Sequence, residues 1–177
     1  NGTNDHHGGH ERGEQTFKMF KPVVPCAFAH QARGHHNTEK LGQNCKLWLE
    51  KHVLGKDIPW PERPKSEIAL GMDGVPELHV TPASPEKITE FQAYYALKNP
   101  VSFGRSWRDA EATRTGDTWV VKMPVLNVDD YVFAFANIRY APDIVVSSDF
   151  TAAVPAKLGK AVATDSTSDI ISEGTGV

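Results

Sequence analysis

The segment from Lys56 to Lys65 constrains the fold more than any other, because the pattern of the sequence changes there. It contains three prolines in ten residues. Proline lacks a backbone N–H and fixes φ, so such a run cannot continue a helix and forms a semi-rigid connection. We therefore predict a linker at 56–65, which separates residues 1–55 from a domain at 66–163.

The stretch after this linker has the pattern of an all-β domain. Its apolar runs are short, rich in β-branched and aromatic residues, and separated by Gly, Pro, Asn and Asp. This spacing favours an immunoglobulin- or fibronectin-III-like β-sandwich, whereas residues 164–177 are small and polar and are expected to form a tail or a linker. The predicted strands are Glu67–Leu70, Glu77–Thr81, Thr89–Leu97, Thr118–Val125, Tyr131–Tyr140 and Asp143–Phe150.

The polarity of three of these runs predicts which faces are buried. Thr89–Leu97 and Thr118–Val125 alternate between apolar and polar residues, so each should bury one face. Tyr131–Tyr140 is apolar on both faces for much of its length, which predicts a central strand. The residues expected to share buried faces are Phe91, Ala93, Tyr95 and Leu97 on one strand and Trp119, Val121 and Met123 on the other.

The stretch before the linker has an α/β pattern. A helix is expected within Glu11–Phe20, a short buried strand at Val23–Ala29, and a second helix from about Thr38 to Leu54 with Asn37 as its cap. This order of helix, strand and helix is typical of one edge of an α/β sheet, but it supplies too few strands for a complete sheet. We therefore expect residues 1–55 to be the C-terminal portion of a larger α/β domain that begins before Asn1.

The second helix and the strand before it also carry the two cysteines of the chain, Cys45 and Cys26. A disulfide between them and a pair of reduced, buried thiols are both compatible with the sequence. The helix itself should bury one face, which is formed by Leu41, Cys45, Trp48, Leu49 and Val53.

The loop between that strand and that helix contains His35 and His36. In open α/β folds, loops after the strands carry the catalytic groups, so an acid–base role is one interpretation and simple exposure to solvent is another. A metal site is a third, because ligand types recur nearby, but no His-Glu-x-x-His pattern is present. We predict no metal and no cofactor. The additional ligand types are Asp5, His6, His7, His10, Glu11 and His30.

The charge and hydropathy of the chain exclude two classes of partner. The formal net charge is -3 and no run of Lys and Arg occurs, so no nucleic acid is expected as a partner. No apolar segment approaches the roughly 20 residues of a membrane-spanning helix. Since the sequence starts at Asn1 without Met, we expect a mature or fragmentary segment.

Three motifs before the linker belong together: the Asn-Gly-Thr-Asn-Asp-His-His segment at 1–7, Gly34-His35-His36, and Leu47–His52 in the helix that follows. With them, the chain resembles the C-terminal end of secreted bacterial α/β-hydrolases of the acetyl xylan esterase and dienelactone hydrolase type. The chain is also similar to the PhoPQ-activated pathogenicity-related group, in which a β-sandwich follows the hydrolase domain. This similarity extends over the linker and from Trp107–Asp109 to Phe133–Asn137.

The resemblance implies a serine-type esterase that is secreted or periplasmic and acts on an ester substrate, such as an acetylated polysaccharide. It maps Asp5 to the triad acid and the histidine loop to the base. We expect His36 to be the base, hydrogen-bonded to Asp5, with His35 as the alternative. The base takes the proton of a serine, and the acid fixes the tautomer of the imidazole.

The nucleophile of such a triad is missing from this sequence. No Gly-x-Ser-x-Gly occurs, so the chain alone lacks the serine and an upstream hydrolase segment is expected to supply it. The alternative is a non-catalytic β-sandwich that binds carbohydrate or a protein partner. An exposed coplanar pair of aromatic rings would favour that alternative, and the residues that decide it are Trp60, Tyr94, Tyr95 and Trp107.

Trp107 belongs to the segment Phe103–Asp109, which also has two interpretations. A tryptophan between arginines suits stacking on a sugar or contact with a partner. We favour a structural role, in which Trp107 closes one end of the sandwich core and the arginines pair with Asp109 or Glu111.

Overall fold

The computed structural model describes residues 3, 15–16, 19, 27 and 41–164. The predicted strand at Val23–Ala29 falls almost wholly outside the described residues, and so do the Asn37 cap and the tail at 165–177. The description that follows concerns the described residues alone.

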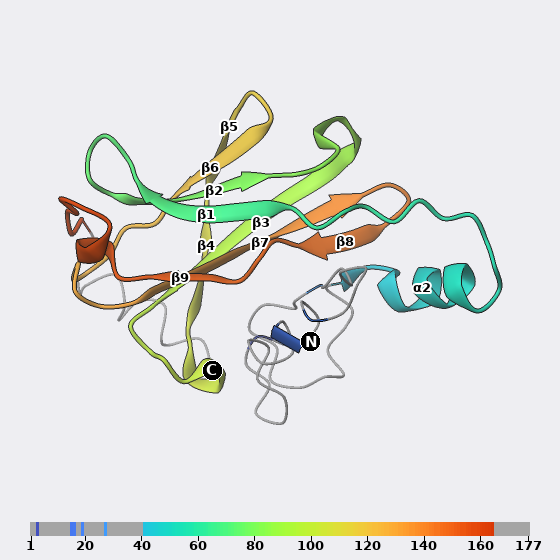
Figure 1. Cartoon of the computed structure of the whole chain (residues 1–177), viewed down its shortest axis with the longest axis horizontal. Helices are drawn as coiled ribbons and strands as arrows, with labels where there is room; N and C mark the ends of the chain where they lie inside the picture. Colours follow the sequence, from blue (N-terminus) through green and yellow to red (C-terminus); the bar gives the residue numbers. More distant parts are fainter. Residues whose placement is uncertain (1–2, 4–14, 17–18, 20–26, 28–40, 165–177) are drawn as a thin grey trace.

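Two antiparallel sheets form a β-sandwich (Figure 1). The first sheet has four strands in the order β1-β2-β6-β5, joined by antiparallel pairing throughout. Gly116, whose φ of +64° suits glycine, and Asp117 form the hairpin turn between β5 and β6. The strands are β1 Lys65–Leu70, β2 Pro76–Thr81, β5 Ala112–Thr115 and β6 Thr118–Lys122.

The second sheet has the order β4-β3-β7-β8. The short strand β9 pairs with the first residues of β7, whereas β8 pairs with its last residues. The longest ladder of this sheet joins β3 to β7, with Tyr94 opposite Phe135 and Leu97 opposite Val132. The predicted central position of Tyr131–Tyr140 is confirmed, because β7 lies between β3 on one side and β8 with β9 on the other. The strands are β3 Ile88–Leu97, β4 Trp107–Ala110, β7 Val132–Tyr140, β8 Ile144–Ser147 and β9 Thr151–Ala153.

The core between the sheets consists of the faces that the alternation predicts. Leu78, Val121, Met123, Ile138 and other apolar side chains form one buried cluster. Across the interface, the rings of Phe91 and Trp119 stack with their centroids 5.2 Å apart and 9° between their planes. Since a sheet buries alternate residues on one face, these contacts follow from the period-two pattern of the sequence.

The second sheet also buries side chains on its outer face. Tyr94, Trp107 and Phe135 are at most 5% exposed and belong to a cluster separate from the inter-sheet core. The ring of Trp107 meets those of Phe135 and Phe150 edge-on, at centroid distances of 5.0 and 5.7 Å. Trp107 is therefore buried, as predicted, but it packs on the outside of this sheet and not in the core between the sheets.

The helix α2 (Asn44–His52) lies at one end of the sandwich (Figure 1). Gln15 and Thr16, within the helix expected at Glu11–Phe20, are also helical. The helix α2 begins later than the predicted start at about Thr38, because the chain at Leu41–Gln43 pairs with the sheet before it turns into the helix. The predicted buried face is largely wrong. Leu41 is buried, but Trp48, Leu49 and Val53 are exposed, and Leu47 contacts the core in their place.

The linker after α2 packs against the sandwich. Ile58 is 9% exposed and belongs to the inter-sheet cluster, and Trp60 packs against the same cluster. Pro64 is also buried, and Lys65 at the end of the predicted linker is the first residue of β1. Residues of the predicted linker thus contribute apolar surface to the sandwich itself.

Candidate functional site

The segment that leads into α2 is joined to the edge of the second sheet. The side-chain amide of Asn44 donates to the carbonyl of Val145 at 2.7 Å and accepts from its backbone N–H at 2.8 Å. The N–H of Gln43 donates to the carbonyl of Asp143, and Gly42 forms a β-bridge with Ile144. Asn44 therefore pairs with β8 much as another strand would.

Glycine is favoured at position 42, where the chain contacts β8. Its φ is +58°, and a Cβ there would lie 2.6 Å from Oδ1 of Asp143 and 2.7 Å from Nη1 of Arg139. The positive φ favours glycine, and a side chain would in addition displace the carboxylate of Asp143 and the guanidinium of Arg139.

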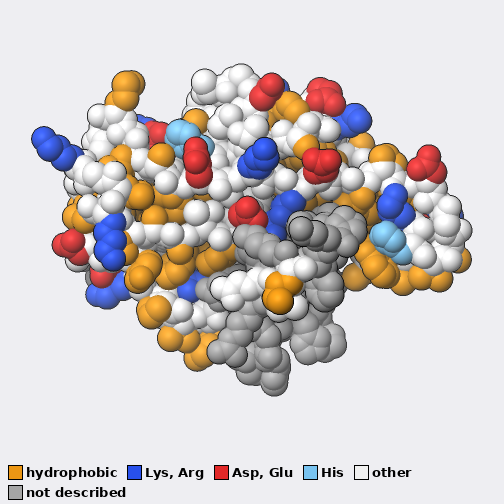
Figure 2. Space-filling model, in the orientation of Figure 1, with side chains coloured by type: hydrophobic (Ala, Val, Ile, Leu, Met, Phe, Trp, Pro, Cys, Tyr) orange, Lys and Arg blue, Asp and Glu red, His pale blue; other side chains and the backbone are white. Residues whose placement is uncertain are grey.

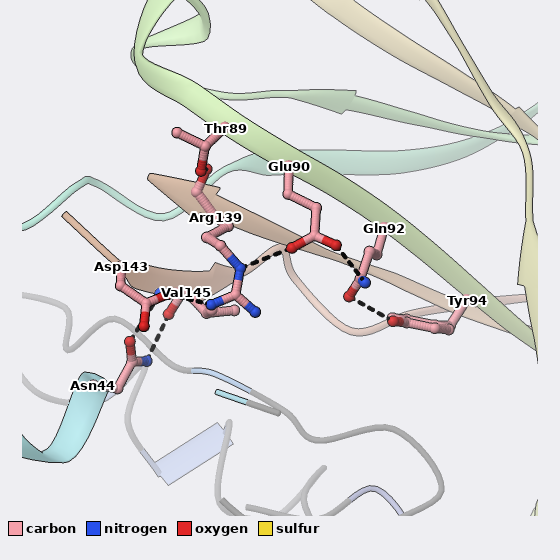
Figure 3. A network of polar contacts seen from close by, with 8 residues as sticks. All are labelled: Asn44, Thr89, Glu90, Gln92, Tyr94, Arg139, Asp143 and Val145. Atoms are coloured by element: carbon pink, nitrogen blue, oxygen red, sulfur yellow. Dashed lines mark hydrogen bonds and ion pairs between the residues drawn. The ribbon is translucent and has the colours of Figure 1, made fainter. Parts of the chain in front are cut away.

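A chain of polar side chains continues from this point across β7 and β3 (Figure 3). Arg139 pairs with Asp143 and, through Nε at 2.7 Å, with Glu90. Glu90 accepts a hydrogen bond from Gln92, which in turn accepts one from the hydroxyl of Tyr94 at 2.7 Å. The bond to Glu90 is the main cause that raises the pKa of Arg139, and burial raises the pKa of Tyr94. The network holds the outer face of the sheet in one arrangement.

Replacing Asn44 by Ala should release from β8 the segment that leads into α2, residues 42–44, which we call the entry segment. The variant loses both hydrogen bonds to Val145, each worth about 1 kcal/mol net. Since the backbone N–H of Val145 donates to Asn44, we expect its amide hydrogen exchange to rise about thirtyfold, the ratio that corresponds to a loss of about 2 kcal/mol. Gln43→Ala is the matched control, because the Gln43 side chain is exposed. Unchanged exchange at Val145 in Asn44→Ala would contradict this account.

A hollow of about 290 Å³ lies between the linker, the connection from β2 to β3, and the end of β7. Trp60 lines it between two flanking prolines, and Glu62, Ser84, Lys87 and Tyr140 supply polar groups. The prolines restrict the backbone on both sides of Trp60, so its ring is held over the core by a stiff segment. The hollow thus combines an aromatic surface with a few convergent polar groups, as small-molecule sites do.

Tyr140 is the most deeply buried of these residues, at 2% exposure, and its ring belongs to the inter-sheet core. No hydrogen-bond partner for its hydroxyl occurs in the described part of the chain. Burial, followed by the charge of Glu86, raises the pKa of Tyr140 to about 12. The hydroxyl is therefore protonated at neutral pH and is a hydrogen-bond donor.

A second hollow, of about 340 Å³, lies between α2 and Trp60 of the linker. It is lined by Trp60, Trp48, Leu49, Cys45 and Asn44. Trp48 is 46% exposed, and its ring lies 4.7 Å from that of His52. Figure 2 shows hydrophobic side chains along the lower edge at this end of the molecule and also along the lower edge at the opposite end, with acidic and basic side chains at both ends.

The catalytic residues that the sequence predicts, Asp5, His36 and His35, all lie outside the described residues. Their separation and partners therefore stay predictions. Cys45 is described and is a free, exposed cysteine, so the pairing with Cys26 is not formed at this residue. Within the described ranges, no group of three potential metal ligands occurs, and no helix is long and apolar enough to cross a bilayer.

Three of the four aromatic residues that bear on carbohydrate binding are buried. Tyr94, Tyr95 and Trp107 are at most 6% exposed, whereas Trp60 is half-buried and lines both hollows. The four residues therefore present no exposed coplanar pair. Sequence reasoning singled out Trp60, but it missed Tyr140, because a tyrosine at the end of an apolar strand looks like ordinary core.

The predicted partners of the arginines near Trp107 are not those found. Arg105 donates to the carbonyls of Asn99 and Pro100 and lies over the ring of Phe133, 3.7 Å from its centroid. Arg108 contacts Tyr95. These arginines serve to close the loop before β4 and to cover aromatic rings.

The fold defines an antiparallel β-sandwich with one helix docked at its end. The chain matches no known family model and no curated protein. Among solved structures, it is similar to a crystal structure of a Br derivative of BhCBM56, with 10% sequence identity and a TM-score of 0.38. The match covers 55% of this chain and 96% of that one.

Proposed function

We propose that this chain is the acid- and base-bearing end of a serine-type carboxylic ester hydrolase. In this proposal, residues 1–55 complete an α/β-hydrolase domain, 56–65 form a linker, 66–163 form an appended sandwich of the immunoglobulin or fibronectin-III type, and 164–177 form a tail or a linker. Asp5 orients His36, which removes the proton from a serine supplied by the upstream hydrolase segment. The protein is secreted or periplasmic and acts on an ester, such as an acetylated polysaccharide.

The observation that supports this proposal is the exposure of apolar side chains in α2 and in the two residues after it. Trp48, Leu49, Val53 and Leu54 are between 46% and 68% exposed, and Leu47 is the only residue of the helix that is buried. Burying a Leu or Val side chain is worth about 1.5–3 kcal/mol. These exposed apolar side chains are therefore expected to be buried by another part of the complete protein. We propose that the upstream sheet of the hydrolase domain packs against them.

The anchor at Asn44 adds to this argument. It fixes the start of α2 on β8, so the helix cannot turn its apolar side chains toward the sandwich without breaking two hydrogen bonds. The resemblance places this helix last in the hydrolase domain, next to the appended sandwich. A helix that is joined to the sandwich at one end and leaves apolar side chains free is consistent with that position.

The chemistry is ester hydrolysis through an acyl-enzyme. The serine attacks the ester carbonyl while His36 takes its proton, and the protonated imidazole then donates to the leaving alcohol. Water attacks the acyl-enzyme with His36 again as base, which releases the acid and restores the serine. The carboxylate of Asp5 stabilises the imidazolium in both steps.

The test uses the protein together with its upstream sequence. We expect a serine in a Gly-x-Ser-x-Gly elbow within the preceding few hundred residues, hydrolysis of p-nitrophenyl acetate, and slower amide exchange throughout α2 than in the 177-residue chain. The 177-residue chain is the matched control and should not hydrolyse the ester. Absence of the elbow, or a longer protein that leaves the exchange of α2 unchanged, would overturn the proposal.

A further inference from the structure

The strand β8 is apolar on both of its faces, although it is the last strand in the order of its sheet. Its residues read Ile-Val-Val-Ser, and all four are buried. Ile144 and Val146 belong to the core between the sheets, so Val145, which lies between them, points outward. Outward residues of a β-sandwich are normally polar and in contact with water. The burial of Val145, at 4% exposure, therefore means that another part of the chain packs against the outer face of this strand.

The residues that pack against Val145 come from the chain before α2. Leu41, itself 6% exposed, forms a buried apolar cluster with Val145, and Ala27 packs against this cluster. The backbone of Val145 is bonded at the same time to the side chain of Asn44. Val145 thus holds the chain before α2 through its side chain as well as through its backbone.

Ala27 and Leu41 flank the segment that contains the histidines of the predicted loop, His35 and His36. Because Ala27 and Leu41 pack in one apolar cluster, both ends of residues 28–40 lie at the same place on β8. A segment whose two ends are fixed at one place has less conformational freedom than a segment held at one end. The cluster therefore limits how far the residues between its members can move from the sandwich.

We propose that the outer face of β8 is the docking surface for the N-terminal part of this chain, and that Val145 positions the histidine loop by holding both of its ends. The segment that docks is the apolar run Val23–Ala29, which contacts the surface through Ala27. This run carries no charged side chain, so it can pack on an apolar strand without the cost of desolvating a charge. The sandwich is then a support for the histidine loop and does not move freely on a linker.

Two further observations agree with a fixed junction. Ile58 and Trp60 of the predicted linker pack on the core between the sheets, which leaves little freedom where the two parts of the chain meet. Thr3 has no exposed surface, so this residue lies within folded structure although it is close to the start of the chain. The inference does not depend on the esterase proposal, because it concerns contacts and holds whatever reaction the histidines serve.

The experiment cuts the histidine loop and asks whether the two pieces stay together. A recognition sequence for a site-specific protease is inserted between Arg33 and Gly34 of the 177-residue chain, and the cut protein is analysed by gel filtration at a series of dilutions. We expect the two pieces to elute together, because Ala27 remains docked on the cluster of Leu41 and Val145 after the cut. Separate elution of the two pieces of the wild-type chain at every dilution would overturn the proposal.

Val145→Thr tests the contact on β8. Threonine keeps the β-branched shape that suits a strand but brings a hydroxyl into an apolar cluster. The dissociation constant of the two pieces should rise about tenfold. Val120→Thr is the matched control, because Val120 is half-buried and faces outward on β6 in the other sheet, and it should leave the constant unchanged. Equal constants for the two variants would remove Val145 from this role.

Leu41→Ala keeps the test decisive if Val145→Thr fails to fold. Leu41 lies outside all the described strands, so its truncation leaves the ladders of both sheets intact. It should also raise the dissociation constant about tenfold, whereas Leu49→Ala, which truncates an exposed side chain of α2, should not. If the pieces of Leu41→Ala bind each other as tightly as those of Leu49→Ala, the N-terminal part is held at another surface and the proposal is wrong.

Discussion

In the complete protein, replacing His36 by Ala should lower kcat about a thousandfold or more and leave KM nearly unchanged. The proposed base acts in the transition state, where it accepts the serine proton, and contributes little to holding the ester beforehand. Residual turnover above the rate in water is expected, because the oxyanion hole and substrate binding survive the loss of one triad member. The measurement is steady-state hydrolysis of p-nitrophenyl acetate.

Two controls separate this role from a general effect of removing a histidine. His52→Ala removes an exposed histidine of α2 that lies against Trp48 and should leave kcat unchanged. His35→Ala should cause a much smaller loss than His36→Ala. The reverse order would transfer the role of base to His35, and turnover near that of the wild type in both variants would remove this loop from the mechanism.

Replacing Phe135 by Ala should cost about 3–5 kcal/mol of unfolding free energy. Phe135 is fully buried on the outer face of β7, where its ring lies 5.3 Å from that of Tyr94 and 5.0 Å from that of Trp107. The substitution leaves a cavity among rigid rings on a central strand, which cannot collapse easily to fill it. Chemical denaturation of the 177-residue chain measures the change.

Met72→Ala is the control for this experiment, because Met72 is fully exposed in the turn between β1 and β2. Its effect should stay within about 0.5 kcal/mol. A loss below about 1 kcal/mol for Phe135→Ala would mean that the outer cluster is loosely packed, and that the sandwich depends on its inter-sheet core alone.

The sequence predicts the sheet faces well, because the period of two is a local signal that packing does not reverse. Phe91, Tyr95, Trp119 and Val121 all pack where the alternation places them. The apolar character of β7 on both faces likewise indicates its central position. By contrast, β4, β5 and β9 escape prediction. They are three or four residues long, and their pairing depends on partners that lie far away in the sequence.

The predictions that were wrong or incomplete concern contacts between residues that are far apart in the sequence. The sequence predicts that the side chain of Trp107 is buried. It does not indicate on which face of the sheet the side chain packs, so the cluster on the outer face could not be predicted. The periodicity of α2 marks an apolar stripe, but it cannot say whether the described part of the chain covers that stripe. The hollow at Trp60 depends on Tyr140 and Lys87, which lie 80 and 27 residues further along the chain.

The contact between Asn44 and Val145 spans 101 residues of the sequence. During synthesis, the entry segment leaves the ribosome about 5–20 s before its partner strand, at the usual rate of about 5–20 residues per second. Throughout that interval α2 has no β8 on which to dock. The joint between the helix and the sandwich is therefore among the last contacts to form in the newly made chain, after the β1–β2 and β3–β4 pairs have been completed.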